Sequence, residues 1–272
     1  MPSDCRGLHT VPEVAIARRT VLLSATLSAL GGCGGTRAAG TVGDAATSRA
    51  ATPGENDSVR SPSPAPSSAA PAVVAAEITH GPRDKLAVAL TFHGAGPLPI
   101  ARAVLDELRR GGVQVTVLAV GSWLDSEPAG ARLVLDDGHE LGNHTAHHLP
   151  MRALPADSVL SEITGCARSL RRLTGSPGNW FRASGTQHTT SVIRTAAASA
   201  GYPVCLSYDV DSLDWRDISP KGITGTVMAA IQPGSIVSMH LGHTGTVAAI
   251  GPLLDALAAR NLHPVTVSKL LR

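Results

Sequence analysis

Residues 138–148 read GHELGNHTAHH, and this stretch decides the expected fold of the 272-residue chain. Its first part, Glu140 to Gly142, is typical of a short strand, and two histidines, His144 and His148, follow at positions i and i+4. One turn of helix brings side chains with this spacing to the same side. Because two neighbouring imidazoles can chelate a divalent ion, the stretch predicts a metal site at the end of a strand.

Strand-like and helix-like segments alternate on both sides of this stretch. The expected strands cover residues 86–92, 113–120, 140–142, 179–181, 204–208 and 235–239, and a last strand begins at Val265. The expected helices cover residues 99–110, 124–137, 156–173, 191–200, 222–231 and 247–260. About seven such strand–helix units predict an α/β fold, an incomplete or distorted (β/α) barrel.

Unusual polar residues follow these strands one after another. They are His93, His144, His148, Arg182, Asp211, Asp214 and His240. Because the carboxyl ends of the strands converge on one face of a barrel, we expect these side chains to share one site. A single polar residue after a strand is often only a helix cap or a turn former, but seven together favour a functional site.

Four motifs carry a resemblance to one family, and they occur in that family's order. Residues 144–148 resemble a His-Ser/Thr-x-x-His motif, and residues 181–185, FRASG, resemble an Arg-Pro-Pro-Tyr/Gly motif without its prolines. Residues 211–215, DSLDW, match Asp-x-x-Asp-Trp, and residues 236–240, IVSMH, resemble the strand that ends in Leu-x-His. Residues 86–271 therefore resemble the polysaccharide deacetylases, the NodB homology group of carbohydrate esterase 4-like proteins.

The resemblance implies a metal-dependent hydrolase that acts on carbon–nitrogen but not peptide bonds. Its expected substrate is an N-acetylated cell-envelope polysaccharide, either peptidoglycan or a chitin-like glycan. The resemblance implies that His144 and His148 bind a divalent ion, for which zinc fits. It also implies that His240, with Asp211 nearby, protonates the leaving amine and that Arg182 belongs to the catalytic set, with backbone N–H groups after it completing an oxyanion hole. The expected substrate contacts are Trp215, as an apolar wall for a sugar ring, Asp214 and Gly185.

The first motif departs from the family's Thr-Phe-Asp-Asp-Gly, because residues 91–95 read TFHGA. His93 is either the third metal ligand, in a three-histidine site that suits catalytic Zn²⁺, or a residue at the position of the catalytic base. It cannot easily serve as both, because a metal-bound imidazole nitrogen no longer accepts a proton. The lost carboxylates also make an alternative credible, a catalytically inactive deacetylase-like lipoprotein that binds envelope glycan. His188 and His243 are spare candidates from exposed loops.

The N-terminal residues are typical of an export signal. Arg18-Arg19 precede an apolar run, residues 21–30, that is far shorter than the ~20 residues a membrane-spanning helix needs. The run is followed by Gly-Gly before Cys33, which resembles a lipobox and predicts a signal peptide over residues 1–33 with lipidation of Cys33. The arginine pair also resembles a twin-arginine signal, so twin-arginine export and the general secretory route both stay open.

Residues 34–80 are rich in Ala, Ser, Pro and Gly, which predicts a disordered tether before a folded domain over residues 81–272. We expect an exported domain, held by N-terminal lipids at the outer face of the cell membrane, or else secreted. Cys166 and Cys205 fall in a helical stretch and a strand, and we expect two buried free thiols. A net charge of +2 without an extended basic block argues against nucleic acid as a partner.

Overall fold

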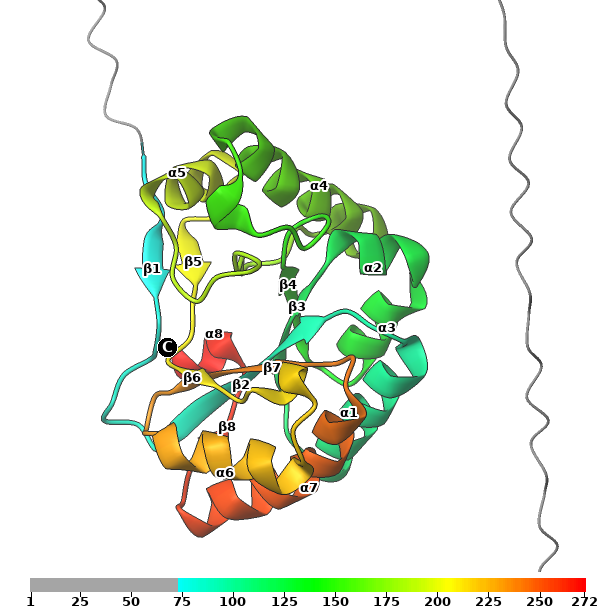
Figure 1. Cartoon of the computed structure of the whole chain (residues 1–272), viewed down its shortest axis with the longest axis vertical. Helices are drawn as coiled ribbons and strands as arrows, with labels where there is room; N and C mark the ends of the chain where they lie inside the picture. Colours follow the sequence, from blue (N-terminus) through cyan, green and yellow to red (C-terminus); the bar gives the residue numbers. More distant parts are fainter. Residues whose placement is uncertain (1–72) are drawn as a thin grey trace, which may run out of the picture. The chain divides into compact units, whose positions relative to one another are not determined.

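A computed structural model describes residues 73–272, in which parallel strands form a curled sheet with helices packed around it (Figure 1). The strands are β1 (Ala76–Ile78), β2 (Ala87–Gly94), β3 (Thr116–Ala119), β4 (Glu140–Asn143), β5 (Val204–Leu206), β6 (Val210–Asp211), β7 (Ile236–His240) and β8 (His263–Pro264). The helices are α1 (Leu98–Arg110), α2 (Gly121–Ser126), α3 (Ala129–Asp136), α4 (Ala156–Thr174), α5 (Ser191–Ser199), α6 (Pro220–Ala230), α7 (Thr244–Ala259) and α8 (Val267–Leu270). Two 3₁₀ turns are η1 (Met151–Ala153) and η2 (Asp214–Arg216).

The strand order explains the shape of the sheet. Hydrogen bonds connect β4-β3-β2-β7-β6, β8 pairs with the first residues of β2, and β1 pairs with β5. Phe181 joins the two parts, because it forms parallel bridges to Asn143 at the end of β4 and to Cys205 in β5. The pairings between the named strands are all parallel. These observations confirm an α/β fold built as a distorted (β/α) barrel.

Strand β2 lies at the centre of the sheet and brings the first functional residue into place. It is buried from Val88 onward, and its apolar run ends at Phe92, as expected for a parallel strand covered on both faces. The next residue, His93, pairs in register with His240, the last residue of β7. Parallel pairing therefore sets two distant histidines side by side at the carboxyl end of the sheet.

The expected helix over residues 124–137 is in fact two helices, α2 and α3. Pro128 lies between them, and proline both lacks an amide donor and disfavours helical backbone at the residue before it. Glu127 accordingly leaves the helical region, with φ −127° and ψ 66°. The expected strand over residues 179–181 contributes only the bridge residue Phe181.

The folded domain begins earlier than we expected. The tether was expected to run to residue 80, but β1 pairs with β5, and the buried Ala75 donates its N–H to the carbonyl of Arg194. A strand of three residues is too short to show a period in the sequence, so this boundary was misplaced. The predicted signal peptide, the lipidation of Cys33 and the tether before residue 73 lie outside the described residues.

The two cysteines of the domain are buried free thiols, as expected. Cys166 lies in α4, where its thiol donates to the carbonyl of Ala119 at 3.2 Å and burial raises its pKa to about 12.

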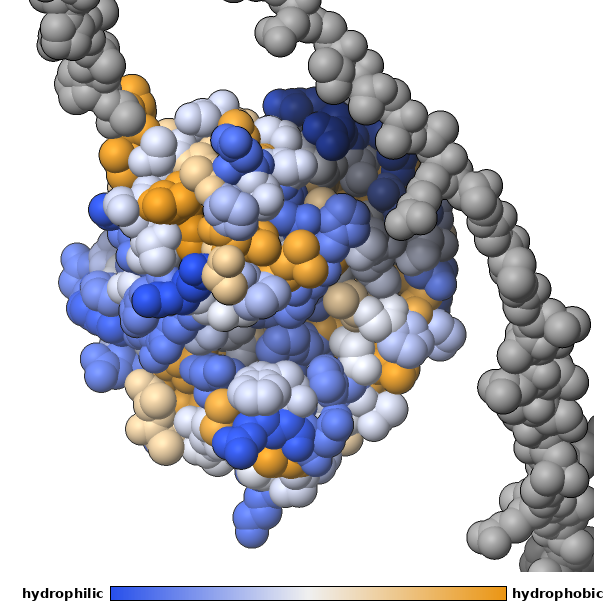
Figure 2. Space-filling model, turned by 45° about the horizontal axis from the view of Figure 1, so that its top comes forward, coloured by the Kyte–Doolittle hydropathy of each residue, from blue (hydrophilic) through white to orange (hydrophobic). Residues whose placement is uncertain are grey.

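Hydrophilic residues separate the apolar patches on the face shown in Figure 2. Within residues 73–272, no helix combines the length and the apolar character that crossing a membrane requires.

Candidate metal centre and its pocket

His144 and His148 come from a loop after β4, and not from the helical turn that their spacing predicted. Thr145 and His148 have left-handed backbone, with φ 68° and 57°, which is uncommon for residues other than glycine. The two left-handed residues curl the loop, so that the rings of His144 and His148 lie 4.9 Å apart. The predicted proximity is therefore correct, although its local geometry is different.

Neighbouring elements hold this strained loop through its own peptide groups. The carbonyls of Thr145 and Ala146 accept the first N–H groups of α2 at 2.9 and 2.8 Å. Glu162, a buried residue of α4, accepts the backbone N–H of His147 at 2.8 Å and contacts its ring Nδ1 at 2.7 Å. Sequence reasoning did not find Glu162, because it is fifteen residues from His147 and no motif marks it.

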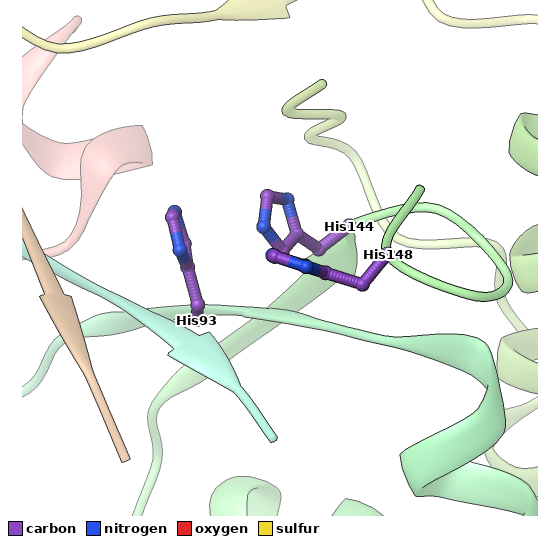
Figure 3. A group of neighbouring side chains, drawn as sticks. All are labelled: His93, His144 and His148. Atoms are coloured by element: carbon purple, nitrogen blue, oxygen red, sulfur yellow. The ribbon is translucent and has the colours of Figure 1, made fainter. Parts of the chain in front are cut away.

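His93, His144 and His148 point their rings toward one another (Figure 3). One ring nitrogen from each lies within 4.8 Å of the corresponding nitrogens of the other two. The Nδ1 of His144 is 3.0 Å from the carbonyl of Arg182, and since a carbonyl can only accept, Nδ1 carries the hydrogen. The Nε2 of His144 is buried without a hydrogen-bond partner among the described residues, and this unpaired nitrogen is what a metal ligand presents.

The charge state of the buried rings also fits a divalent ion. Burial lowers the pKa of His93 well below its ordinary value, and Coulombic repulsion from the neighbouring rings of His144 and His240 adds to the effect. Burial likewise lowers the pKa of His144 well below the ordinary value. Neutral imidazoles are the form that binds metals. The three histidines thus form a candidate site for a divalent metal ion.

Arg182 contacts His93 and is only 1% exposed. Its Nη1 donates to the hydroxyl of Thr91 at 2.8 Å and lies 3.4 Å from His93 Nε2, while its Nε donates to the carbonyl of Leu206. The guanidinium stacks over Tyr208, 5.2 Å from the ring centre. Burial lowers the pKa of Arg182 to about 10, so it stays charged at neutral pH. Among the described residues, no carboxylate pairs with it.

His240 is hydrogen-bonded to Asp214, whereas we expected Asp211 to be its neighbour. Asp214 is fully buried, and its oxygens accept from His240 Nδ1 at 2.7 Å, from the His240 backbone N–H at 2.8 Å and from the Thr246 hydroxyl at 2.7 Å. Burial alone raises the pKa of Asp214, but its bonds with His240 outweigh this and lower it. Asp214 therefore supports His240 from inside the protein, a place from which it cannot make the substrate contact we expected.

A cavity of about 510 Å³ opens over these residues. Of the predicted residues, its lining includes His93, His148, Gly185, Asp211, Trp215 and His240. Sequence reasoning missed the other lining residues, which are Ala183, Thr186, Gln187, Tyr208 and Ser238, and it left His243 as a spare candidate. Trp215 is 50% exposed, and Gly185 has φ +65° with Pro150 Cα only 2.9 Å from where a Cβ would lie. A side chain at position 185 would therefore be strained.

Fold and site together define a class, an α/β protein of the distorted-barrel type with a candidate histidine metal site at the carboxyl ends of its strands. The family model described as polysaccharide deacetylase matches residues 80–205. A chitooligosaccharide deacetylase of Bradyrhizobium sp. (strain ANU 289) is 32% identical over 204 aligned residues, covering 65% of this chain and 88% of the relative. The chain belongs to the polysaccharide deacetylase family.

Two solved structures with similar folds differ in whether the protein is an active enzyme. A peptidoglycan N-acetylglucosamine deacetylase, in complex with 4-naphthalen-1-yl-N-oxidanyl-benzamide, has a TM-score of 0.67 and 25% identity, covering 72% of this chain and 92% of its own. A carbohydrate esterase family 4 pseudoenzyme from Bacillus anthracis has a TM-score of 0.68 and 25% identity, covering 72% and 69%. Because an enzyme and a pseudoenzyme match equally well, the fold alone does not decide catalysis.

Proposed function

We propose that this chain is a zinc-dependent hydrolase that removes N-acetyl groups from a cell-envelope polysaccharide, either peptidoglycan or a chitin-like glycan. One observation carries the proposal. The buried and unpaired Nε2 of His144 lies beside two further imidazoles, His93 and His148. These two line a cavity together with His240, a histidine held by a buried carboxylate. A metal site beside an oriented histidine is the combination that amide hydrolysis needs.

His93, His144 and His148 are the residues that would hold the ion, and a set of nitrogen ligands suits Zn²⁺. When bound, the ion would polarise the acetamide carbonyl and lower the pKa of a water molecule toward ~7. The protein contributes neutral rings, because burial disfavours protonation of His93 and His144. The carbonyl of Arg182 fixes the ring orientation of His144.

His240 is the proposed proton donor to the leaving amine. Its Nδ1 hydrogen is held by Asp214 at 2.7 Å, and its Nε2 lies 3.0 Å from Nδ1 of His93. Nε2 is therefore the ring nitrogen that would carry the transferable proton once His93 turns to a metal. The buried carboxylate stabilises the imidazolium that must form before transfer and keeps the ring from turning. Asp214 therefore has the role of supporting His240 that we first expected of Asp211.

The cavity lining offers contacts for a sugar. Trp215 presents a half-exposed aromatic face against which the apolar side of a sugar ring can lie. Asp211, at the end of β6, is a candidate acceptor for sugar hydroxyl groups. Backbone N–H groups after Arg182, starting with the lining residue Ala183, are candidates for an oxyanion hole.

The proposed site of action is the cell envelope, where the substrate would be found. The sequence pattern before Cys33 supports export with an N-terminal lipid anchor at the outer face of the membrane, with secretion as the alternative.

A glycan-binding protein without activity is the second candidate, and a specific contact favours it. Arg182 is buried against an imidazole and carbonyl groups, so no carboxylate base is in place beside it within residues 73–272. A similar fold also serves a pseudoenzyme. Such a protein would keep the sugar contacts of the cavity and lack turnover.

Acetate release separates the two candidates. The zinc-loaded protein is incubated with N-acetylglucosamine oligomers and with peptidoglycan, beside His240→Ala and the control His263→Ala, an exposed histidine of β8. We expect release by the wild type and the control, and a loss of at least about 100-fold in His240→Ala with glycan affinity kept. If the wild type binds a glycan and releases no acetate from it, the binding protein is the correct interpretation.

A further inference from the structure

A second histidine–carboxylate pair lies at the same cavity. His243 Nδ1 is 2.7 Å from Asp217 Oδ1, and His243 is part of the cavity lining. The pair repeats the arrangement of His240 with Asp214, because each of its members comes three residues later in the sequence. The mechanism proposed above leaves this second pair without a role.

The fold builds both pairs from the same two segments. Asp214 begins the turn η2, and Asp217 follows its last residue, with left-handed φ 53° and its N–H bonded to the carbonyl of Asp214 at 3.0 Å. His240 ends β7, and His243 directly precedes α7. The two imidazole centres are therefore only 5.8 Å apart, with their planes at 80°.

The two pairs differ in exposure, and this difference separates their roles. The side chain of Asp214 is 0% exposed, but that of Asp217 is 79% exposed and that of His243 is 26% exposed. An exposed pair of this kind contributes only ~0–1 kcal/mol to stability. The second pair is thus accessible to a molecule that enters from solvent, and it contributes little to the stability of the fold.

The chemistry of His243 fits a sugar hydroxyl group. A carboxylate only accepts, so Nδ1 of His243 carries the hydrogen, and Nε2 is the ring atom left for a ligand. Among the described residues, none forms a hydrogen bond with that Nε2. Trp215, half-exposed and also lining the cavity, lies on the turn that leads to Asp217. An aromatic face near a free hydrogen-bonding nitrogen is what a sugar ring with its hydroxyl groups would use.

We propose that His243, oriented by Asp217, is a substrate-positioning residue that binds a hydroxyl group of the glycan while an acetamide lies at His240. The inference rests on the proposed function and deepens it, because it assigns a further residue to recognition of the glycan. Asp217 touches no substrate in this assignment and acts by holding the ring of His243.

Kinetics with the zinc-loaded full chain test the assignment. Acetate release from the tetramer of N-acetylglucosamine is measured for His243→Ala, Asp217→Ala and the double variant. Losing one hydrogen bond predicts a KM about tenfold higher for His243→Ala with kcat within about twofold. Asp217→Ala should raise KM less, and the double variant should match His243→Ala, because both residues serve one contact.

Asp125→Ala is the matched control, since Asp125 forms an exposed pair with Arg172 at 2.6 Å and is absent from the cavity lining. It should leave KM unchanged. A fall in kcat without a change in KM, an unchanged KM in His243→Ala, or fully additive effects in the double variant would overturn the proposal.

Calorimetric titration of the metal-depleted protein with the same tetramer separates this inference from the proposed function. Binding about tenfold weaker in His243→Ala than in the wild type supports the inference, even if no variant releases acetate and the hydrolase proposal fails. Equal binding by both proteins overturns the inference and leaves acetate release to decide the hydrolase proposal. A wild type that neither binds nor deacetylates the tetramer overturns the inference.

Discussion

The Nε2 atom of His93 lies 3.4 Å from Nη1 of Arg182. The buried guanidinium therefore has an imidazole as its neighbour, and not a carboxylate that would neutralise its charge. Because a guanidinium can only donate, Nε2 accepts, and the hydrogen of the neutral ring sits on Nδ1. That Nδ1 is 3.0 Å from Nε2 of His240. Both ring nitrogens of His93 are thus engaged within the protein, and one contact must give way when His93 binds a metal.

Metal content distinguishes the two roles of His93. We expect near-stoichiometric zinc in the purified wild type and the loss of most of it in both His93→Ala and His144→Ala, because each substitution removes one of three ligands. Elemental analysis after dialysis gives the measurement, and His263→Ala serves as the control. Zinc lost in His144→Ala but kept in His93→Ala would assign His93 to the base position.

Glu162→Gln should lower zinc affinity by about tenfold, although Glu162 is not a ligand. Its carboxylate holds the backbone and ring of His147, and so fixes the loop that carries His144 and His148. Competition with a chromogenic chelator measures the affinity, and Glu107→Gln on the surface of α1 is the control. Equal affinities of Glu162→Gln and the wild type would show that the loop holds its shape without this bond.

Gly94→Ala should lower the free energy of unfolding by ~1–3 kcal/mol. A Cβ at this position would lie 3.0 Å from Ala119 Cα and 3.0 Å from Val117 Cγ1, because β2 and β3 approach closely there. Urea unfolding measures the change, with Gly251→Ala in α7 as the control. A Cβ at Gly251 meets nothing within 4 Å, so that variant should gain ~0.5–1 kcal/mol. A Gly94→Ala variant as stable as the wild type would contradict the tight packing of β2 on β3.

Glu77→Gln should destabilise the protein by about 1 kcal/mol at pH 7, and by less as the pH falls below the ordinary pKa of 4.5. Burial opposes ionisation of Glu77, but bonds from the Ser207 hydroxyl and the Thr189 N–H, both at 2.7 Å, lower its pKa below the ordinary 4.5. A carboxyl group with a lowered pKa stabilises the fold above its unfolded-state pKa, and this stabilisation is lost as the pH falls through the folded-state value.

Urea unfolding of the wild type and Glu77→Gln at several pH values tests this link between β1 and its neighbours. His188, whose Nδ1 is 3.9 Å from the same carboxylate, also lowers the pKa of Glu77 by Coulombic attraction, so His188→Ala is included. A difference between wild type and Glu77→Gln that does not change with pH would show that ionisation of Glu77 is irrelevant to stability.

The sequence by itself determined the class of fold and most members of the site. The alternation of strand and helix patterns predicted the distorted barrel. Each pattern reflects which residues of one segment are buried, and this depends mainly on the local sequence. Four of the polar residues after the strands line one cavity, since parallel strands of a barrel end on the same face. The other three, His144, Arg182 and Asp214, are buried and contact His93 or His240. His93, His144 and His148 could be named for this reason before any distance was known.

Only the tertiary structure decided which of these residues touch. Pairing of β2 with β7 sets His93 beside His240, and the turn η2 gives His240 the partner Asp214 in place of Asp211. Glu162 reaches the loop that carries His147 because α4 packs beside that loop. Asp217 likewise reaches His243 because the turn η2 lies beside the end of β7. Contacts between residues far apart in sequence depend on strand register, on loop backbone angles and on the packing of whole elements. Local patterns of hydrophobicity and spacing determine none of these, so side-chain partners follow only from the folded chain.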